Sequence, residues 1–178
     1  MARFVAFVAI IACCFPQSGK ADELTDYLGK DGKLTKKLVF ADALTTPTTW
    51  DGCRFEISPS GDWAKYCGRF PDPVSKGKLD QKQISALGQC LAAQNFGKLP
   101  KVMGWTPKAE PGKLVGYVAG VVSISFGEKE TRFYTQKSKY EYLGQPGTSE
   151  ANEWLRFVSI ELLLRDLLKD DSPKKESK

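Results

Sequence analysis

The chain contains no histidine among its 178 residues. Histidine is the usual general base near neutral pH and the commonest metal ligand. Its absence excludes the Ser-His and Cys-His catalytic arrangements. The cysteines show no paired spacing that would replace histidine in a zinc site. We therefore expect no catalytic residue, no metal and no cofactor, and a protein that is not an enzyme.

The chain also lacks an apolar run long enough to cross a bilayer. Its longest run, Phe4–Phe15, has about a dozen residues, whereas a spanning helix needs about 20. The run follows a basic start, Met1–Arg3, and precedes the polar segment Pro16–Ala21 with small residues near its end. This is the pattern of a cleaved signal peptide over residues 1–21. We predict an exported mature chain, periplasmic or secreted, that begins at Asp22 and keeps no membrane span.

A second interpretation of the N-terminus remains open. The segment Ile10–Cys13 reads IIAC and resembles the bacterial lipobox, whose cysteine is lipidated and becomes the first mature residue. The apolar stretch before Cys13 is short for such a signal, and the downstream cleavage pattern is intact. A lipoprotein anchored through Cys13 is the alternative localisation.

Neither sign of charge dominates the sequence. The net charge is +5, and it falls to +3 when residues 1–21, with two basic side chains, are removed. This excess is too small and too dispersed to predict binding to nucleic acid or to an anionic membrane. The remaining length suits a single domain over residues 22–169. The charged segment 170–178 has the composition of a disordered tail.

The segment Cys53–Cys67 reads CRFEISPSGDWAKYC, with apolar and polar residues alternating on both sides of a turn. This period of two predicts a hairpin with one buried face. Pro59 suits the first central position of a type I turn, and Gly61 suits the left-handed residue that closes a three-residue loop. The resulting register closes on Ser58 and Asp62 and pairs Ile57 with Trp63, Phe55 with Lys65, and Cys53 with Cys67.

This register predicts a disulfide bond. Counted outward from the closing pair, Cys53 and Cys67 occupy a position without direct hydrogen bonds, where side chains of neighbouring strands approach most closely. An exported protein meets an oxidising compartment. We therefore predict a Cys53–Cys67 disulfide bond and a free, buried thiol at Cys90. The alternative is that all three mature cysteines are small buried residues.

A helix is predicted after Leu79. Asp80 is the expected N-cap and Gln83 its reciprocal partner, while Leu79 and Ile84 form a hydrophobic staple. Cys90 borders the apolar face, and Gly97 with the following Pro100 is expected to end the helix. The apolar face consists of Ile84, Leu87 and Leu91.

Two more elements follow. Residues 118–126 and 131–136 predict a second hairpin around a turn at residues 127–130. Val122, Ile124, Phe126 and Phe133 are expected to share one face of it. A long helix begins at Thr148 or Ser149. Its main apolar stripe, expected to pack on a sheet, contains Phe157, Ile160, Leu164, Leu167 and Leu168. A second stripe contains Leu155, Val158 and Leu162, which we expect the Leu38–Phe40 segment to cover.

The order hairpin, helix, hairpin, helix predicts an α+β fold. The hairpins pair into one antiparallel sheet, and both helices cover one face in a two-layer sandwich. Residues 34–43 would add a strand at the edge of this sheet.

Three runs carry a resemblance: WDGCRFEISPSGDW, KGKLDQKQISALGQCLAAQNFGKLP and VSISFGEKETRF. Together they are similar to a recurring pattern in small exported bacterial proteins of unassigned function. The pattern joins a Gly-Asp-Trp hairpin, a helix that ends near Leu-Pro and a Gly-Glu-Lys hairpin, and it covers roughly residues 34–135. The resemblance implies the α+β fold and transfers no active site. The Cys53–Cys67 pair is not a regular feature of such proteins.

Few residues in the sequence suggest a catalytic or ion-binding site. The segment Gly29–Lys33 has some features of phosphate and calcium loops but lacks the full spacing of either, so we interpret it as a lysine-rich turn. Carboxylates that would have to converge for hydrolysis are Glu56, Asp62, Glu128 and Glu130. Solvated charges at strand ends explain them equally well. A small hydrolase is the least favoured function.

We predict a non-catalytic module that binds a protein or a glycan. Its exposed aromatic residues would carry the binding, and the candidates are Trp50, Tyr66, Trp105, Tyr140 and Tyr142, with Trp63 expected in the core. An inhibitor that inserts the Ser58–Asp62 tip or the Trp105 loop is one form of this module. The alternative is a structural or assembly subunit, weakly self-associating, that uses the Leu155, Val158 and Leu162 stripe.

Overall fold

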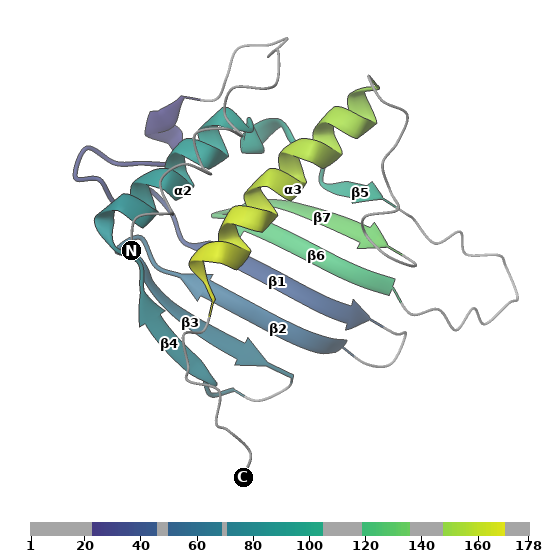
Figure 1. Cartoon of the computed structure of the whole chain (residues 1–178), viewed down its shortest axis with the longest axis horizontal. Helices are drawn as coiled ribbons and strands as arrows, with labels where there is room; N and C mark the ends of the chain where they lie inside the picture. The colour runs from purple at the N-terminus through teal and green to yellow at the C-terminus, as the bar shows by residue number, and fades with distance from the viewer. Residues whose placement is uncertain (1–22, 46–49, 69–70, 105–118, 136–147, 170–178) are drawn as a thin grey trace, which may run out of the picture.

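The computed structural model describes residues 23–45, 50–68, 71–104, 119–135 and 148–169 (Figure 1). Two short 3₁₀ helices, two α-helices and seven strands occur in this part of the chain. In chain order they are η1 (Leu24–Asp26), β1 (Leu38–Thr45), β2 (Trp50–Ile57), β3 (Asp62–Cys67), β4 (Ser75–Lys78), α2 (Gln81–Ala93), η2 (Phe96–Lys98), β5 (Val102–Gly104), β6 (Ala119–Phe126), β7 (Lys129–Thr135) and α3 (Ser149–Leu167).

The strands form one seven-stranded sheet in the order β4-β3-β2-β1-β6-β7-β5. All neighbouring pairs are antiparallel except β5 with β7, which is parallel. The predicted α+β class is therefore confirmed, with a sheet that is mixed but mostly antiparallel. Helices α2 and α3 both cross the same side of this sheet (Figure 1).

The first strand lies at the centre of the sheet. We expected a strand over residues 34–43 to lie at an edge, but β1 pairs with β2 on one side and with β6 on the other. Leu38 and Phe40 are almost completely buried, and a central position gives them neighbours on both sides. Leu38 and Phe40 belong to the core against which Leu155 and Val158 pack, and the coverage of the second stripe of the last helix by this segment stays a prediction.

The first hairpin has the predicted register. Ile57 faces Trp63, Phe55 faces Lys65, and Cys53 faces Cys67. The Ser58 backbone N–H donates to the Asp62 carbonyl at 2.8 Å, as expected for the closing pair. Gly61 has φ +87°, the left-handed conformation that glycine adopts without strain. Local turn chemistry therefore determines the register here.

Helix α2 begins as predicted and ends earlier. The Gln83 N–H donates to the Asp80 carboxylate at 2.8 Å, and the Asp80 N–H donates to the Gln83 side chain at 2.8 Å, which completes the capping box. The predicted stop at Gly97 is wrong, because the helix ends at Ala93. Asn95 takes the left-handed conformation, with φ 49°, a role for which asparagine is second only to glycine.

The core lies between the sheet and the helices. Val122, Ile124 and Phe126 of β6 and Phe133 of β7 are buried on one face, as predicted. Helix α3 starts after Thr148, whose hydroxyl accepts from the Ala151 N–H at 3.2 Å. Its buried residues include Trp154, Phe157, Ile160 and Leu164.

Two strands were not predicted from the sequence. Strand β4 pairs with β3, and its Gly77 leaves room for the Trp63 ring, which a Cβ atom would approach to 2.4 Å. Trp63 packs against the core, as expected. Strand β5 is only three residues long, so no period of two is visible in it.

Candidate binding cavity beside the disulfide

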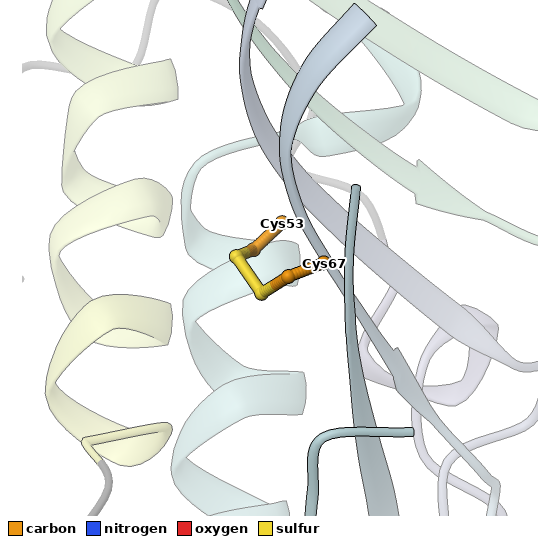
Figure 2. The surroundings of a disulfide bond; sticks show 2 residues. All are labelled: Cys53 and Cys67. Carbon is orange, nitrogen blue, oxygen red and sulfur yellow. A yellow bond between two sulfur atoms is a disulfide. The ribbon is translucent and has the colours of Figure 1, made fainter. Parts of the chain in front are cut away.

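Cys53 and Cys67 form a disulfide bond between β2 and β3, as predicted, with their Cα atoms 4.1 Å apart. They lie on the same face of the hairpin as Ile57, which is fully buried. Figure 2 shows both side chains leaving their strands on the side of the sheet where the helices lie. The disulfide therefore contributes to the interior surface of the fold.

A cavity of about 450 Å³ lies next to the disulfide, between the sheet and the C-terminal end of α3. Strands β1, β2 and β3 form its floor. Its lining residues are Phe40, Asp42, Gly52, Cys53, Phe55, Lys65, Arg165, Leu168 and Lys169. Elements from both ends of the chain therefore build it.

Aromatic rings form the apolar wall of this cavity. The rings of Phe40 and Phe55 stack with their centroids 6.1 Å apart, and Phe55 contacts Trp63 at 6.0 Å. The Lys65 ammonium lies 5.4 Å from the Phe55 centroid, within the range of a cation–π interaction. Aromatic stacking and this cation fix the orientation of the Phe55 ring.

Arg165 fixes the polar side of the cavity. Its Nε donates to Glu161 at 2.8 Å, and its guanidinium also binds Asp42 of β1. Burial disfavours the charged guanidinium, but the hydrogen bonds to Asp42 and Glu161 outweigh that effect and raise the pKa of Arg165. Because Glu161 is only 1% exposed, this guanidinium balances a buried charge.

The charges around the cavity are matched. Lys169 pairs with Asp166, Arg165 pairs with Asp42 and Glu161, and Lys65 faces an aromatic ring. The site is widely open to solvent, with apolar side chains on its floor and polar groups at its rim. Its volume lies within the range of about 300–1,000 Å³ that small-molecule pockets occupy.

The predicted interaction residues that the structure describes do not line the cavity. Tyr66 is on the opposite face of the sheet, with the Arg54 guanidinium 4.9 Å above its ring. Leu155 and Val158 pack partly against the core, so of the second stripe only Leu162, at 46%, is exposed. Trp105, Tyr140 and Tyr142, and the side chain of Trp50, lie outside the described residues.

The Ser58–Asp62 tip is held from both sides. The Leu34 N–H donates to the Pro59 carbonyl at 3.0 Å, and the Leu79 N–H donates to the Gly61 carbonyl at 2.9 Å. Gly61 itself is buried. This tip is therefore packed against its neighbours and does not project as a free loop.

The carboxylates considered for hydrolysis do not converge. Glu56 on β2 pairs with Lys37 and Arg54, whereas Glu130 on β7 pairs with Arg132 of the same strand. Strands β2 and β7 are three positions apart in the sheet. Asp62 lies in the first hairpin, where a hydrogen bond from Ser60 is the main cause that lowers its pKa. Glu128 lies in the β6–β7 turn. The described residues contain no cluster of side chains suited to hold a metal ion.

Gly29–Lys33 is a turn, as interpreted from the sequence. The Gly29 N–H donates to the Lys33 carbonyl at 2.8 Å, and Leu28 and Leu34 form a bridge on either side. The Asp31 carboxylate accepts from the Lys33 N–H at 3.2 Å, which is the main cause that lowers its pKa. Asp31 therefore stabilises the turn itself.

Two charged residues in the sequence are a signal for the cavity. Asp42 and Lys65 occupy positions that face the helices, where the period of two predicts apolar residues. A charged residue at an inward position is typical of a buried ion pair or of a cavity. Arg165 gives no such signal, because charged residues are common near a helix C-terminus.

No protein-family model and no curated protein matches this chain. The described helices include none with the length and apolar character needed to cross a membrane.

Proposed function

We propose that this protein is an exported, non-catalytic binding module that takes a compact apolar ligand into the cavity beside the Cys53–Cys67 disulfide. The ligand is a small molecule with a ring-shaped apolar body and polar substituents. The cavity itself, with aromatic walls and a matched polar rim, is the observation that carries the proposal. The proposed architecture is a two-layer sandwich in which both helices cover one face of a sheet organised around two hairpins.

The walls favour an apolar ring. Phe55 is only partly buried and presents its ring to the cavity. Phe40 and Leu168 also line the cavity but are only 1% and 4% exposed, so a flat ligand ring would stack mainly on Phe55. Aromatic pairs in offset or edge-to-face arrangements contribute about 0.5–1.5 kcal/mol beyond the burial of area. The cavity therefore selects flat apolar groups over flexible polar chains.

The rim favours polar substituents. The Asp42 carboxylate and the Arg165 guanidinium lie side by side at the cavity, so one offers acceptors and the other donors. A hydroxyl group on the ligand would donate to Asp42 or accept from Arg165 without adding a charge to this pair. These groups orient the ligand, whereas the aromatic walls supply most of its affinity.

The export proposal agrees with the disulfide. Disulfide bonds persist in oxidising compartments such as the periplasm and the extracellular space. The bond joins the two strands at the cavity floor, so it limits the collapse of an unoccupied cavity. Such preorganisation lowers the cost of ordering the site on binding.

Titration with a panel of hydroxylated aromatic compounds, followed by amide NMR, tests the binding proposal. We expect chemical-shift changes at the amides of Phe40, Asp42, Cys53, Phe55 and Leu168. Matched cyclohexane compounds should bind more weakly, because they lack the ring face. The proposal is wrong if the whole panel leaves these amides unchanged, or if the changes occur only on the opposite face of the sheet.

A variant supports the assignment of the walls. Phe55→Leu removes the ring but keeps an apolar side chain, and we expect about a three- to tenfold loss of affinity. Val39→Ala is the matched control, because Val39 lies in the same sheet on the opposite face and its truncation should leave the affinity unchanged. Equal affinity of Phe55→Leu and the original protein would contradict the role of the aromatic wall.

A further inference from the structure

The face of the sheet opposite α2 and α3 carries no described helix or strand (Figure 1); we call it the outer face. On β1, the buried Leu38 and Phe40 point toward the helices, so Val39 and Ala41 point outward. The same alternation places Arg54 and Glu56 of β2 outward. It also places outward the residues Ser123 and Ser125 of β6 and Glu130 and Arg132 of β7.

Strand register aligns these residues in two rows. The first row runs Arg54, Ala41, Ser123, Arg132 across four neighbouring strands. An arginine therefore stands at each end of two small residues. With neighbouring strands about 4.8 Å apart, the two arginine Cα atoms are roughly 14 Å apart.

The second row repeats this pattern with acidic ends. It runs Glu56, Val39, Ser125, Glu130 across the same strands. It lies two residues further along each strand, which is about 6.7 Å. The outer face thus has arginine at both ends of one row, glutamate at both ends of the next, and small side chains between them.

We propose that the outer face binds the outer face of a second copy of this chain. A two-fold axis that lies in the interface, at right angles to the strands and midway between the rows, brings the arginine row of each copy onto the glutamate row of the other. Arg54 then faces Glu56 of the second copy, and Arg132 faces its Glu130. The contact is isologous, as in most homodimers.

The charge pattern selects this orientation. An axis parallel to the strands would place Arg54 opposite Arg132, and Glu56 opposite Glu130. Like charges in direct opposition across an interface disfavour that arrangement. The charges complement a second copy in one orientation and oppose it in the other.

The side chains allow close approach. Sheets that pack face to face lie about 10 Å apart, and the residues that the structure describes between the charged ends of the two rows are small. The side chains of Arg54 and Arg132 are 48% and 45% exposed, so both can extend toward a partner. The glutamates already pair within the chain, Glu56 with Lys37 at 2.5 Å and Arg54 at 3.1 Å, and Glu130 with Arg132 at 2.8 Å. Their side chains are 23% and 28% exposed.

The dimer is therefore weak and sensitive to salt. Association replaces ion pairs within each copy by ion pairs between copies, so the net gain is small. Exposed ion pairs are screened as ionic strength rises. The second copy binds on the side of the sheet away from the cavity, so this inference does not depend on the proposed ligand.

Sedimentation velocity of the chain purified from the exported fraction tests the proposal. We expect self-association that increases over about a hundredfold range of concentration and decreases when salt is added. Arg54→Glu and Glu56→Arg should each weaken it at least about tenfold, because each places like charges in opposition. Lys82→Glu is the matched control, because Lys82 is an exposed residue of α2.

Mixing the two charge-reversed variants makes the test decisive. Arg54→Glu carries two acids on β2 and Glu56→Arg carries two bases, so each becomes complementary to the other across the proposed axis. We expect the mixture to form a heterodimer although each variant alone is monomeric. A monomer at every concentration, unchanged association in both variants, or a mixture that stays monomeric would overturn the proposal.

Discussion

Cys53 and Cys67 lie 14 positions apart in the sequence and directly opposite each other in the hairpin. A bond that closes a loop of this length stabilises a fold by roughly 3 kcal/mol in the chain-entropy account. The pairing was predictable because the Ser58–Asp62 turn sets the register locally. At the cavity, the same bond also joins the two strands of the floor.

Cys90 differs from the bonded pair, because its thiol is free and packs against the core. Burial raises the pKa of Cys90 from 9.0 to about 12, since a thiolate loses hydration there. The thiol is therefore protonated at neutral pH and a poor nucleophile. This agrees with a structural role for Cys90.

The raised pKa predicts a dependence of stability on pH. The unfolded thiol ionises above about pH 9, whereas the folded thiol does not until about pH 12. The contribution of Cys90 to stability is therefore complete below pH 9 and is lost as the pH rises toward 12. Urea unfolding of the original protein and of Cys90→Ala, compared at increasing pH, isolates this contribution from other titrating groups. A difference between them that does not change with pH would contradict the burial of the thiol.

Among the elements, α2 was predictable at its start and not at its end. Asp80 and Gln83 form a local signal that depends on three residues of spacing. The end depends on tertiary contacts, because the Gln94 and Asn95 carbonyls accept hydrogen bonds from Arg156 of α3 at 2.7 and 3.0 Å. The stop at Asn95 therefore reflects an interaction with a distant helix.

Helix α3 is attached to the sheet through Arg165, which links Glu161 to Asp42 of β1. We expect Arg165→Met to destabilise the protein by roughly 3 kcal/mol, because it removes the cationic partner of a buried carboxylate. Adding Glu161→Leu should recover most of that loss, since the buried charge is then absent. Chemical denaturation of the single and double variants measures both effects.

Arg54→Met provides the control for this comparison. Arg54 also pairs with a glutamate, but its side chain is 48% exposed, and exposed pairs typically contribute less than about 1 kcal/mol. If Arg165→Met costs no more than Arg54→Met, then Arg165 does not act as the partner of a buried charge.

At the scale of the whole molecule, local patterns predicted the α+β class and the existence of both hairpins, but not the order of the strands. The second turn is also shorter than the predicted residues 127–130, because Phe126 already pairs with Lys129. Strand β1 pairs with β6, which lies far along the sequence, and no turn specifies that register. The parallel pairing of β5 with β7 depends equally on distant segments. The cavity was not predicted for the same reason, because Phe40, Lys65 and Arg165 meet only when these long-range pairings have formed.

The central position of β1 also predicts how the sheet opens. All eight residues of β1 pair with β2 on one side and with β6 on the other, so exposing its amides requires separating both halves of the sheet. Strands β4 and β5 lie at the edges and pair on one side only. Local opening requires less free energy where fewer contacts break.

In native-state hydrogen exchange we expect the amides of Leu38–Ala43 to exchange last and those of Ser75–Lys78 and Val102–Gly104 to exchange first. Protection in β5 equal to that in β1 would mean that the edge strand opens only with the whole sheet, and would contradict the role of β1 as its centre.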